Sequence, residues 1–364
     1  MARIHKVAVL PGDGIGPEVT REAVATLKLA SEIHGFGLEL REFPFGAEHY
    51  LRTKEAFPPS ALDELRGFDA ILLGAIGDPR IPVGMLERAI ISGIRFGLDL
   101  YVNLRPIKLH AEAMCPLKDK RPEDVDLIVI RENTEDVYAG IGGFLKKGTP
   151  DEVAVQEMIF TRKGVERVVR YAFDLCRKRA RRKKLTLVDK ANAVAAMDLW
   201  TRAFAEVGEA YPDIERDHAY IDAACMWMVK NPESFDTVVV SNMFGDILTD
   251  LGAAIQGGMG VAASGNIHPG RVSMFEPIHG SAPKHAGKNV ASPIGAILAG
   301  QMLLDHVGEP DAAALVGSAV ETLFQTNTLR STGTDSGVST TAQGDLVRTA
   351  MKRSAATPTG KTAS

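Results

Sequence analysis

The sequence predicts an α/β fold with a large, mostly parallel sheet flanked by helices. Short runs of valine, isoleucine and leucine recur along the chain, and turn residues bound each run. A run that is apolar at every position suits a strand buried on both faces, as in a parallel sheet. Helical patterns between the runs supply the connections that such a sheet needs. The apolar runs are residues 7–10, 70–73, 127–130, 185–188 and 237–240.

Two stretches between these runs have the periodicity of amphipathic helices. Residues 17–34 begin with Pro17, which suits a first helical turn, and place Ala23 and Leu27 on one side. Residues 164–180 repeat apolar side chains at similar spacing. No internal repeat is visible, so the alternation of strand and helix is the main organising pattern.

Length, composition and charge narrow the class of protein. A chain of 364 residues is long enough for about two domains. The formal net charge of -4 gives no global attraction to nucleic acid or to a membrane surface. Cys115, Cys176 and Cys225 cannot all pair and lack metal-ligand spacing, which favours a reducing compartment.

Targeting and nucleic-acid signals are weak. The first residues enter an apolar strand without the pattern of a signal peptide, and no apolar run approaches membrane-spanning length. The basic run RKRARRKK at 177–184 has no interleaved aromatic residues. We interpret it as a solvated helix end, where cations suit the negative end of the helix dipole. We therefore expect a cytoplasmic protein with neither nucleic acid nor membrane as a partner.

The glycine-rich segment VAVLPGDGIGPEV at 7–19 predicts a strand, a tight turn and a helix. Gly12, Gly14 and Gly16 alternate, and Pro17 takes the place that the last glycine of a G-x-G-x-x-G fingerprint would need. The fold is therefore not expected to be a Rossmann fold. From its residues alone, we interpret the loop as a tight turn, and a cofactor-binding loop is the second interpretation.

The segment SNMFGDILTD at 241–250 places two carboxylates on one face of a predicted helix. Asp246 and Asp250 are four residues apart, a spacing at which like charges destabilise a helix by a few tenths of a kcal/mol. Asp222 lies in YIDAACMWMV, among residues that otherwise look buried. Three acidic groups gathered together form the all-oxygen ligand set of Mg²⁺ or Mn²⁺. The simpler alternative is a solvated helix start.

Basic and aromatic groups complement these acids. Lys190 follows a predicted strand directly, where an unpaired buried charge costs several kcal/mol. Arg95, Arg105 and Arg131 suit a di- or tricarboxylic acid, because arginine pairs with carboxylates in bidentate fashion. Tyr138 is by default a packing residue, but beside a bound oxyanion it can serve as a general acid.

Six motifs in order resemble those of the metal-dependent β-decarboxylating dehydrogenases, the isocitrate/isopropylmalate dehydrogenase family. The resemblance runs from about Val7 to about Met351 and is nearest to the isopropylmalate and tartrate/D-malate branches. The motifs are LPGDGIGPEV, DLYVNLRP, RENTEDVY, VDKAN, SNMFGDILTD and FEPIHGSAP.

The resemblance implies an isopropylmalate dehydrogenase-like fold of two domains. Residues 1–100 and 257–352 would form the large cofactor-binding domain, and 101–256 the small dimerisation and substrate domain. The small, polar segment 353–364 is expected to be a disordered tail. In this family two subunits complete each active site, so a homodimer is expected.

The resemblance also assigns roles to individual residues. Asp222, Asp246 and Asp250 would hold Mg²⁺ or Mn²⁺, with Asp222 and Lys190 reaching the partner's site. Tyr138 and Lys190 would be catalytic. Substrate contacts would come from Ala89, Ile91, Arg95, Arg105, Arg131 and Asp222. Cofactor contacts would come from Asn192, His279, Gly280, Ala282, Lys284, His285, Asn289 and Arg330.

Substrate choice depends on positions just before Arg95. Isocitrate enzymes place a serine and an asparagine there to bind the γ-carboxylate, whereas this chain has Ala89 and Ile91. Neither side chain can hydrogen-bond a carboxylate, which predicts a small or apolar γ group, as in isopropylmalate, malate or tartrate. RENTEDVYAG is more isocitrate-like. An isocitrate-type substrate therefore stays open as the alternative.

The predicted adenosine loop HGSAPKHAGKNVASP at 279–293 favours NADP over NAD. NAD-using relatives carry an aspartate after the proline, where this chain has Lys284. A cation there suits a 2′-phosphate, and Arg330 could add a second charge. NADP-using relatives follow the lysine with tyrosine, whereas here His285 follows it. Ser292 replaces an asparagine that relatives use near the adenine.

Two other functions fit the same family. One is a non-catalytic regulatory subunit, but such subunits lose catalytic residues, and Tyr138, Lys190 and the three aspartates are all present. The other is a metal-dependent decarboxylase with no net redox change. Appearance of reduced nicotinamide separates a dehydrogenase from both.

Overall fold

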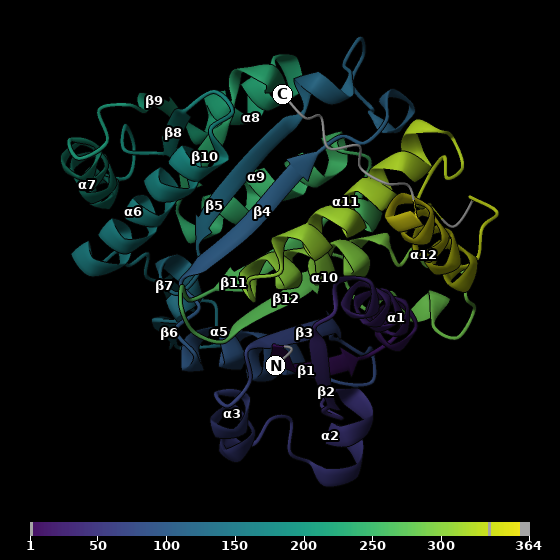
Figure 1. Ribbon diagram of the computed structural model, residues 1–364. Coiled ribbons are helices and arrows are strands. Elements are labelled where there is room, and N and C mark those ends of the chain that lie inside the picture. The colour runs from purple at the N-terminus through teal and green to yellow at the C-terminus, as the bar shows by residue number, and fades with distance from the viewer. Residues whose placement is uncertain (1–2, 334–335, 357–364) are drawn as a thin grey trace.

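A single sheet of 10 strands forms the centre of the computed structural model, which describes residues 3–333 and 336–356 (Figure 1). The order across the sheet is β2-β1-β3-β12-β11-β4-β5-β10-β8-β9. The strands are β1 (Ile4–Gly12), β2 (Gly37–Glu42), β3 (Ala70–Ala75), β4 (Val102–Lys108), β5 (Asp126–Glu132), β8 (Lys184–Asp189), β9 (Glu215–Tyr220), β10 (Thr237–Val240), β11 (Ala263–Ile267) and β12 (Ser273–Pro277).

The sheet is mostly parallel, as the apolar runs predict. β2, β1, β3 and β12 pair in parallel, and so do β5, β10, β8 and β9. Between these groups, β11 pairs antiparallel with β12 and β4, and β4 pairs antiparallel with β5. Three reversals separate the groups, so they run in opposite directions. This strand order is not that of a Rossmann fold, which confirms the expectation from the glycine spacing.

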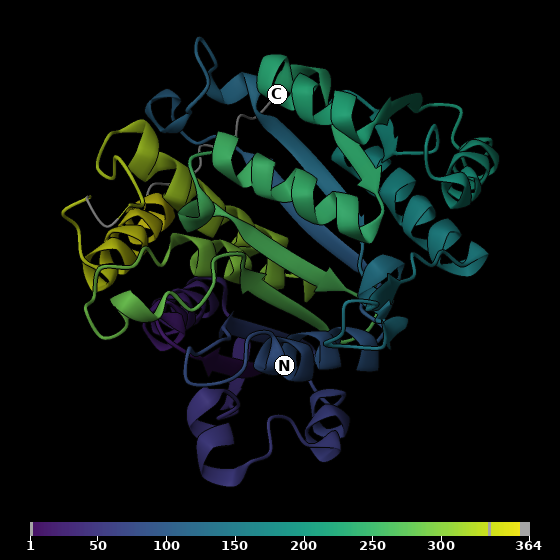
Figure 2. The same cartoon turned by 180° about the vertical axis from the view of Figure 1, so that it is seen from behind.

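Both faces of the sheet are covered by helices. Val7 and Val9 of β1 face one apolar layer, whereas Ala8 and Leu10 face the other, because successive side chains of a strand point to opposite faces. The first layer contains α1, α10, α11 and α12 beside β1, β3 and β12, and α6 and α7 farther along (Figure 1). The second contains α2, α3 and α5 in one part and α8 and α9 in another (Figure 2).

The longer helices connect the strands in chain order. They are α1 (Gly16–His34), α2 (Ala47–Thr53), α3 (Pro59–Leu65), α5 (Gly93–Gly97), α6 (Arg162–Arg179), α7 (Asp198–Gly208), α8 (Ile221–Lys230), α9 (Asn242–Ile255), α10 (Ile294–His306), α11 (Pro310–Gln325) and α12 (Thr340–Ala356). A separate antiparallel hairpin is formed by β6 (Gly142–Leu145) and β7 (Val153–Gln156).

The strands and helices expected from the sequence agree with these elements. All five apolar runs are strands of the sheet, and the two periodic stretches are α1 and α6. The last helix continues to Ala356, so the expectation of a disordered tail is wrong for residues 353–356. Residues 357–364 lie outside the described part of the chain. The domain bounds at 100 and 257 stay a prediction. The strands before residue 100 and after residue 257 are neighbours in one half of the sheet, and the strands between these bounds form the other half.

The basic run at 177–184 has a structural use. Arg179 donates to Asp236 through Nη1 at 2.5 Å and also to Asp126, so it ties the end of α6 to the start of two strands. Arg177 pairs with Asp213. These contacts favour the interpretation as a helix end. The three cysteines are free thiols. Within the described residues, none of the helices combines the length and the apolarity needed to cross a bilayer.

His110 provides a test of core packing through pH. It is buried against Phe324, with the ring centroids 5.6 Å apart, and burial lowers its pKa from 6.5 to about 4. Between those values the unfolded chain binds a proton that the folded chain excludes. Stability is therefore lost as pH falls from 6.5 toward 4, by up to about 3 kcal/mol for this one group.

We expect His110→Phe, which keeps an aromatic ring against Phe324, to lose less unfolding free energy over that pH range than the unaltered protein. Urea unfolding at a series of pH values measures it. His34→Gln, at an exposed histidine in the last turn of α1, is the matched control and should leave the slope unchanged. Equal slopes for His110→Phe and the unaltered chain would contradict the assignment.

Candidate active site

The candidate site lies where parallel strands end. β5, β10, β8 and β9 are neighbours and run in one direction, so their carboxyl ends share one edge of the sheet. Arg131 is at the end of β5, Asn242 opens the helix after β10, Lys190 follows β8, and Asp222 lies in the first turn of the helix after β9. Carboxyl ends of parallel strands are where ligands bind in open α/β sheets.

Arg131, Asp246 and Tyr138 form a connected cluster at this edge. Arg131 is buried; its Nε donates to Asn242 Oδ1 at 2.9 Å, and its Nη1 donates to Asp246. The Tyr138 hydroxyl donates to the other Asp246 oxygen at 2.8 Å, and the Arg131 guanidinium lies 5.4 Å from the Tyr138 ring centroid. Gly245 makes this approach possible, because a Cβ there would lie 2.6 Å from Arg131 Cγ.

The two helix carboxylates have different electrostatic surroundings. Burial alone would raise the pKa of Asp246, but the Arg131 cation and the Tyr138 hydroxyl outweigh it and bring the pKa below its usual value. Burial and the nearby Asp246 charge raise the pKa of Asp250. The positive charges of Arg105 and Arg131 offset these two effects only in part, so some repulsion between the carboxylates remains. A divalent cation between the two carboxylates would offset it, and carboxylate oxygens are the donors that Mg²⁺ and Mn²⁺ prefer.

Arg105 adds a second buried cation to the cluster. Its Nε donates to Asn103 Oδ1 at 2.8 Å and Ser264 Oγ at 3.0 Å. Burial, together with the positive charges of Arg131 and Arg95, lowers the pKa of Arg105 to about 9. Three arginines thus lie close enough to repel one another. Such a group suits an anion with several carboxylate oxygens.

Arg95 reaches the cluster from a different element. Its Nη2 donates to Glu276 Oε1 at 2.8 Å, and Asn266 Nδ2 donates to the same oxygen at 2.8 Å. Arg95 Nε is buried without a partner among the described residues. A buried, unpaired donor of this kind is costly unless a ligand satisfies it.

Ala89 and Ile91 lie in a π-helical turn, Arg88–Ser92, directly before α5. Both are partly buried, and Ile91 precedes Arg95 by four residues, which puts the two on one side of the helix. Single π turns occur often at functional sites. Ile91 also packs against the apolar layer that contains α2, α3 and α5.

Lys190 and Asp222 form a separate pair at the same edge. Lys190 Nζ donates to Asp222 Oδ1, and this hydrogen bond lowers the pKa of Asp222. β8 lies two strands from β5, which corresponds to about 10 Å across the sheet. Within one chain the pair therefore stands apart from Arg131 and Asp246.

The three aspartates do not converge within one chain. Among residues 3–333 and 336–356, no group of three or more His, Cys, Asp and Glu side chains is arranged to hold a metal ion. Asp222 engages Lys190, whereas Asp246 engages Arg131 and Tyr138. Because the resemblance places Asp222 in the partner's site, one chain would supply only Asp246 and Asp250. The three-aspartate site stays a prediction.

The interpretation of YIDAACMWMV as a buried segment is wrong for the single chain. The Asp222 side chain is 68% exposed. Met226, Trp227 and Val229 of α8 and Ile247 of α9 are also exposed, although they are large and apolar. α8 and α9 pack against each other on the face seen in Figure 2, so these exposed residues come from two neighbouring helices.

The segment after β12 contains most of the predicted cofactor residues. Ala282 has a left-handed backbone, φ 40°, before a short 3₁₀ turn that holds Lys284 and His285. Lys284 and Gly280 are exposed. His279 Nε2 is buried without a partner in the described chain, so it is free to meet a ligand atom.

Other predicted cofactor residues are placed differently. The Asn289 carboxamide oxygen accepts from the backbone N–H of Thr341 at 3.1 Å and is thereby tied to α12. Ser292 Oγ donates to Gln343 Oε1 at 2.9 Å. Asn192 is exposed beside Lys190, and Arg330 is exposed on the loop after α11. Neither lies in the segment after β12.

The glycine loop after β1 is packed against backbone. A Cβ on Gly12 would lie 2.0 Å from the Ala75 carbonyl oxygen, and one on Gly14 would lie 2.0 Å from the Ser281 carbonyl oxygen. Ile15 N–H donates to that Ser281 oxygen at 2.8 Å. The glycines therefore serve a close backbone contact with the segment after β12, which supports the interpretation as a tight turn.

Sequence reasoning missed the residues that hold the functional ones. Glu276, Asn266 and Asn103 position arginines, and Asn242 positions Arg131. Glu18 accepts from the backbone N–H of Asn289 at 2.9 Å and of Gly287, which fixes the segment after β12. Glu276 lies within the motif FEPIHGSAP, so a charged residue inside an apolar strand was the available signal.

The chain matches the family described as isocitrate/isopropylmalate dehydrogenase over residues 6–347. It is 51% identical over 322 residues to a protein of Thermobifida fusca named 3-isopropylmalate dehydrogenase, covering 88% of this chain and 91% of that one. A Bifidobacterium longum protein of the same name is 48% identical over 338 residues, covering 91% and 97%.

Solved structures show the same likeness. The crystal structure of isocitrate dehydrogenase from Methylococcus capsulatus superposes with a TM-score of 0.85 at 36% identity, covering 96% of this chain and 99% of that one. The fold and these likenesses define the class as a decarboxylating dehydrogenase acting on a CH–OH group. More narrowly, the chain belongs to the isocitrate/isopropylmalate dehydrogenase family.

The pair Arg95–Glu276 provides a test of how the site is held. In Glu276→Gln the charge that holds Arg95 is lost, while the shape of the side chain is kept. We expect KM for the hydroxy acid to rise about tenfold with a smaller change in kcat, since Arg95 would contribute binding to ground state and transition state alike. Glu321→Gln, at an ion pair with Lys108 away from the cluster, is the control. Unchanged kinetics in Glu276→Gln would show that Glu276 does not position Arg95.

Proposed function

We propose that this enzyme oxidatively decarboxylates a 2-hydroxy-3-carboxy acid with a small or apolar γ group, with 3-isopropylmalate as the first candidate. The observation that carries the proposal is a group of three arginines, Arg95, Arg105 and Arg131, that lie close enough to repel one another, with Arg131 paired to Asp246 at the end of β5. Relatives at about half identity carry the name 3-isopropylmalate dehydrogenase. Malate- and tartrate-like acids belong to the same substrate class.

The π-helical turn supports an apolar γ group. Ala89 and Ile91 precede Arg95 in the chain and offer no hydrogen-bond donor through their side chains. A third carboxylate placed there would be desolvated without a partner, which costs several kcal/mol. An isocitrate-type substrate is the second candidate, because the Methylococcus capsulatus structure is an isocitrate dehydrogenase and RENTEDVYAG is isocitrate-like.

The residues of the site would divide the work as follows. The three arginines hold the substrate carboxylates and fix the reacting carbon. Lys190 of the partner subunit takes the hydroxyl proton, and Tyr138 returns a proton to the carbon from which CO₂ has left. Two bound groups would supply the remaining chemistry: Mg²⁺ or Mn²⁺ at Asp246 and Asp250 would polarise the hydroxyl, and the nicotinamide would accept hydride.

Tyr138 is suited to its proposed role by its environment. Burial raises the pKa of the Tyr138 hydroxyl, and the hydrogen bond to Asp246 raises it further. The hydroxyl therefore keeps its proton at neutral pH and is available as a donor. All the predicted catalytic residues are present, which distinguishes the chain from a non-catalytic regulatory subunit.

A substrate panel tests the proposed function. Purified protein is assayed for reduced nicotinamide with 3-isopropylmalate, D-malate, tartrate and isocitrate, with Mg²⁺ or Mn²⁺ and both nicotinamides. We expect 3-isopropylmalate to give the highest kcat/KM, chelator to abolish turnover, and Tyr138→Phe to lower kcat by 10²-fold or more. Isocitrate as the best substrate would refute the apolar γ pocket. Decarboxylation without reduced nicotinamide would instead indicate a non-redox decarboxylase.

We propose NADP as the preferred cofactor, on the strength of Lys284. This exposed cation follows Pro283 in the segment after β12, and His285 lies beside it in the same 3₁₀ turn. A 2′-phosphate gains from a cation and is repelled by an anion. Arg330 would be a second contact only if it approached this segment, and no interaction joins them in the described chain.

The preference is tested by reversing the charge. In Lys284→Asp we expect kcat/KM for NADP to fall at least tenfold while that for NAD rises or holds. Lys288→Asp, at an exposed lysine four residues on, is the matched control for charge alone. If the ratio of kcat/KM for NADP to that for NAD is the same in Lys284→Asp and the unaltered enzyme, Lys284 does not determine the cofactor preference.

We propose that the enzyme works as a cytoplasmic homodimer with shared active sites. The exposed apolar surface of α8 and α9 supports this, because Met226, Trp227, Val229 and Ile247 would otherwise face water. The hairpin β6–β7 adds exposed apolar residues, including Phe144 and Val155. A dimer would also bring a second chain's Lys190–Asp222 pair to the edge where Asp246 lies.

Mixed dimers test the shared site. Lys190→Met and Arg131→Met are each expected to lower activity at least 100-fold, because each removes one half of the site. Mixing the two variants after partial unfolding should restore a substantial fraction of activity, since one site in each mixed dimer is then intact. Mixing each variant with itself is the control. No recovery in verified mixed dimers would show that each chain uses its own Lys190.

A further inference from the structure

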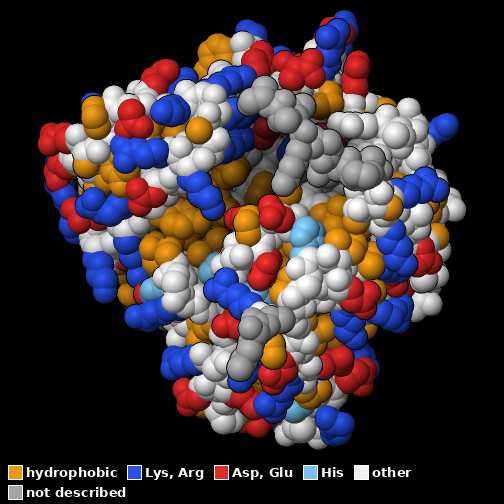
Figure 3. Space-filling view, viewed as in Figure 1, with side chains coloured by type: hydrophobic (Ala, Val, Ile, Leu, Met, Phe, Trp, Pro, Cys, Tyr) orange, Lys and Arg blue, Asp and Glu red, His pale blue; other side chains and the backbone are white. Residues whose placement is uncertain are grey.

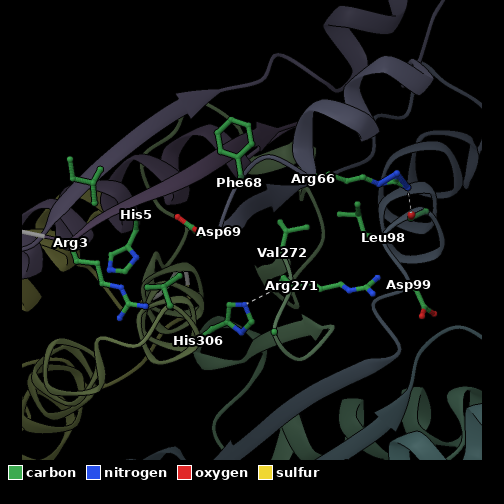
Figure 4. Close-up of a pocket in the computed structure, with 14 residues that line it drawn as sticks. Arg3, His5, Arg66, Phe68, Asp69, Leu98, Asp99, Arg271, Val272 and His306 are labelled. Atoms are coloured by element: carbon green, nitrogen blue, oxygen red, sulfur yellow. Dashed lines mark hydrogen bonds between the residues drawn. The ribbon is translucent and has the colours of Figure 1, made fainter.

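A large pocket lies away from the candidate active site, at the amino ends of β1, β3 and β12. Its volume is about 880 Å³. Residues before or at the start of these strands line it, among them Arg3, Phe68 and Val272, and His306 at the end of α10 closes one side (Figure 4). Pockets of roughly 300–1,000 Å³ are typical of small-molecule sites.

Three arginines line this pocket from separate segments. Arg66 and Arg271 extend to the same side of Figure 4 with Leu98 between them, whereas Arg3 lies across the view. The side chains of Arg3 and Arg271 make no hydrogen bond or ion pair with any described residue. Arg66 donates to the Gly97 carbonyl oxygen at 2.8 Å and to Asp63 Oδ1 at 3.4 Å, so it is held in place by neighbouring groups.

The acidic residues of the pocket are already engaged. Asp69 Oδ2 accepts from the backbone N–H of Lys6 at 2.8 Å. Asp99 is paired with Arg167, which lies outside the pocket, at 2.8 Å. Asp69 keeps its negative charge, because a backbone N–H carries none. With Arg66 paired to Asp63 and Asp99 paired to Arg167, the two arginines without a partner in the described chain, Arg3 and Arg271, still outnumber this one carboxylate.

The rest of the lining divides between neutral polar and apolar groups. His306 Nε2 lies 3.1 Å from the Arg271 carbonyl oxygen, and burial lowers the pKa of His306, so the ring is neutral near pH 7. Phe68, Leu98 and Val272 supply apolar surface. A bound molecule could therefore place its charged groups against guanidinium groups and its apolar part against these apolar side chains.

We propose that this pocket is a binding site for an organic oxyanion, a molecule that carries phosphate or carboxylate groups on a partly apolar body of up to about nucleotide size. Arg3 and Arg271 bind the oxyanion groups, and Arg66 stabilises one of them from its backbone-held position. Guanidinium groups pair with phosphate and with carboxylate in the same bidentate geometry, so a ligand that carries either group would suit the site.

The pocket is connected to Arg95 through two short segments. α5 carries Arg95 and leads directly into Gly97, Leu98 and Asp99, which line the pocket. Val272 lines it and immediately precedes β12, which carries Glu276, the partner of Arg95. Both members of the Arg95–Glu276 pair therefore lie within five residues of the pocket wall, and an occupant acts as an effector of substrate binding.

Binding is tested by calorimetry on the full-length enzyme with inorganic phosphate, citrate and ADP as probes. The unaltered chain is compared with Arg3→Gln, Arg271→Gln and the double variant. Because neither arginine has a partner among the described residues, these changes leave the fold intact, which thermal unfolding checks. We expect at least one probe to bind the double variant tenfold or more weakly than the unaltered protein. Tight binding of ADP but not of citrate would identify phosphate as the group that the arginines recognise. Tight binding of citrate but not of ADP would identify carboxylate.

The matched control is Arg52→Gln, at an exposed arginine on α2 outside the pocket. It should bind every probe as the unaltered chain does, and a crystal soaked with the best probe should show it against Arg271. Equal affinity for every probe in the double variant and the unaltered protein would overturn the proposal, because probes then bind only elsewhere.

The effector role rests on the proposed function and has its own readout. With the best probe bound, KM for the hydroxy acid should shift at least twofold in the unaltered enzyme and stay constant in the double variant. A constant KM in both would overturn the coupling while leaving the binding result intact. Calorimetry needs no turnover, so failure of the proposed activity would not mimic failure of the site.

Discussion

The site depends on the placement of buried positive charge against a helix that carries two carboxylates. Arg131 and Arg105 are buried and repel each other, and burying a cation without compensation costs several kcal/mol. Asp246 compensates part of this by pairing with Arg131 and Tyr138. The positive charge that Asp246 does not compensate would suit a dianionic substrate. Asp250 lies near Asp246, and a divalent cation would relieve the repulsion between these two carboxylates.

This balance explains why so many polar side chains lie inside the sheet. Asn103, Ser264, Asn266 and Glu276 come from three adjacent strands and hold the arginines at fixed positions. They join β4 to β11 and β12. The polar side chains of β4, β11 and β12 therefore help to fix the buried arginines that are proposed to bind the substrate.

Much of this arrangement could be predicted from local sequence. Apolar runs identified five strands because a parallel strand is buried on both faces, and Pro17 marked the start of α1. The pairing of Asp246 with Arg131 could not be predicted from spacing, since the two are 115 residues apart and meet only through neighbouring strands. Glu276 and its partner Arg95 are 181 residues apart, so this pairing could not be predicted from spacing either, although a charge inside an apolar strand was a signal for Glu276 itself.

The error over Asp222 has a related physical cause. Apolar residues around it indicate burial, but a hydrophobic surface can be buried either by its own chain or by another one. In this chain Met226 and Trp227 stay exposed, so sequence alone identified an apolar surface without showing what covers it. The proposed dimer would cover it and bring Asp222 to a second chain's site.

The most direct measurement is anomalous diffraction from crystals of the dimer grown with Mn²⁺. The account predicts one manganese peak per site, ligated by Asp246 and Asp250 of one chain and by Asp222 of the partner subunit, with the arginine cluster facing its open coordination positions. A dimer in which Asp222 points away from Asp246 and Asp250, with manganese absent or bound elsewhere, would contradict it.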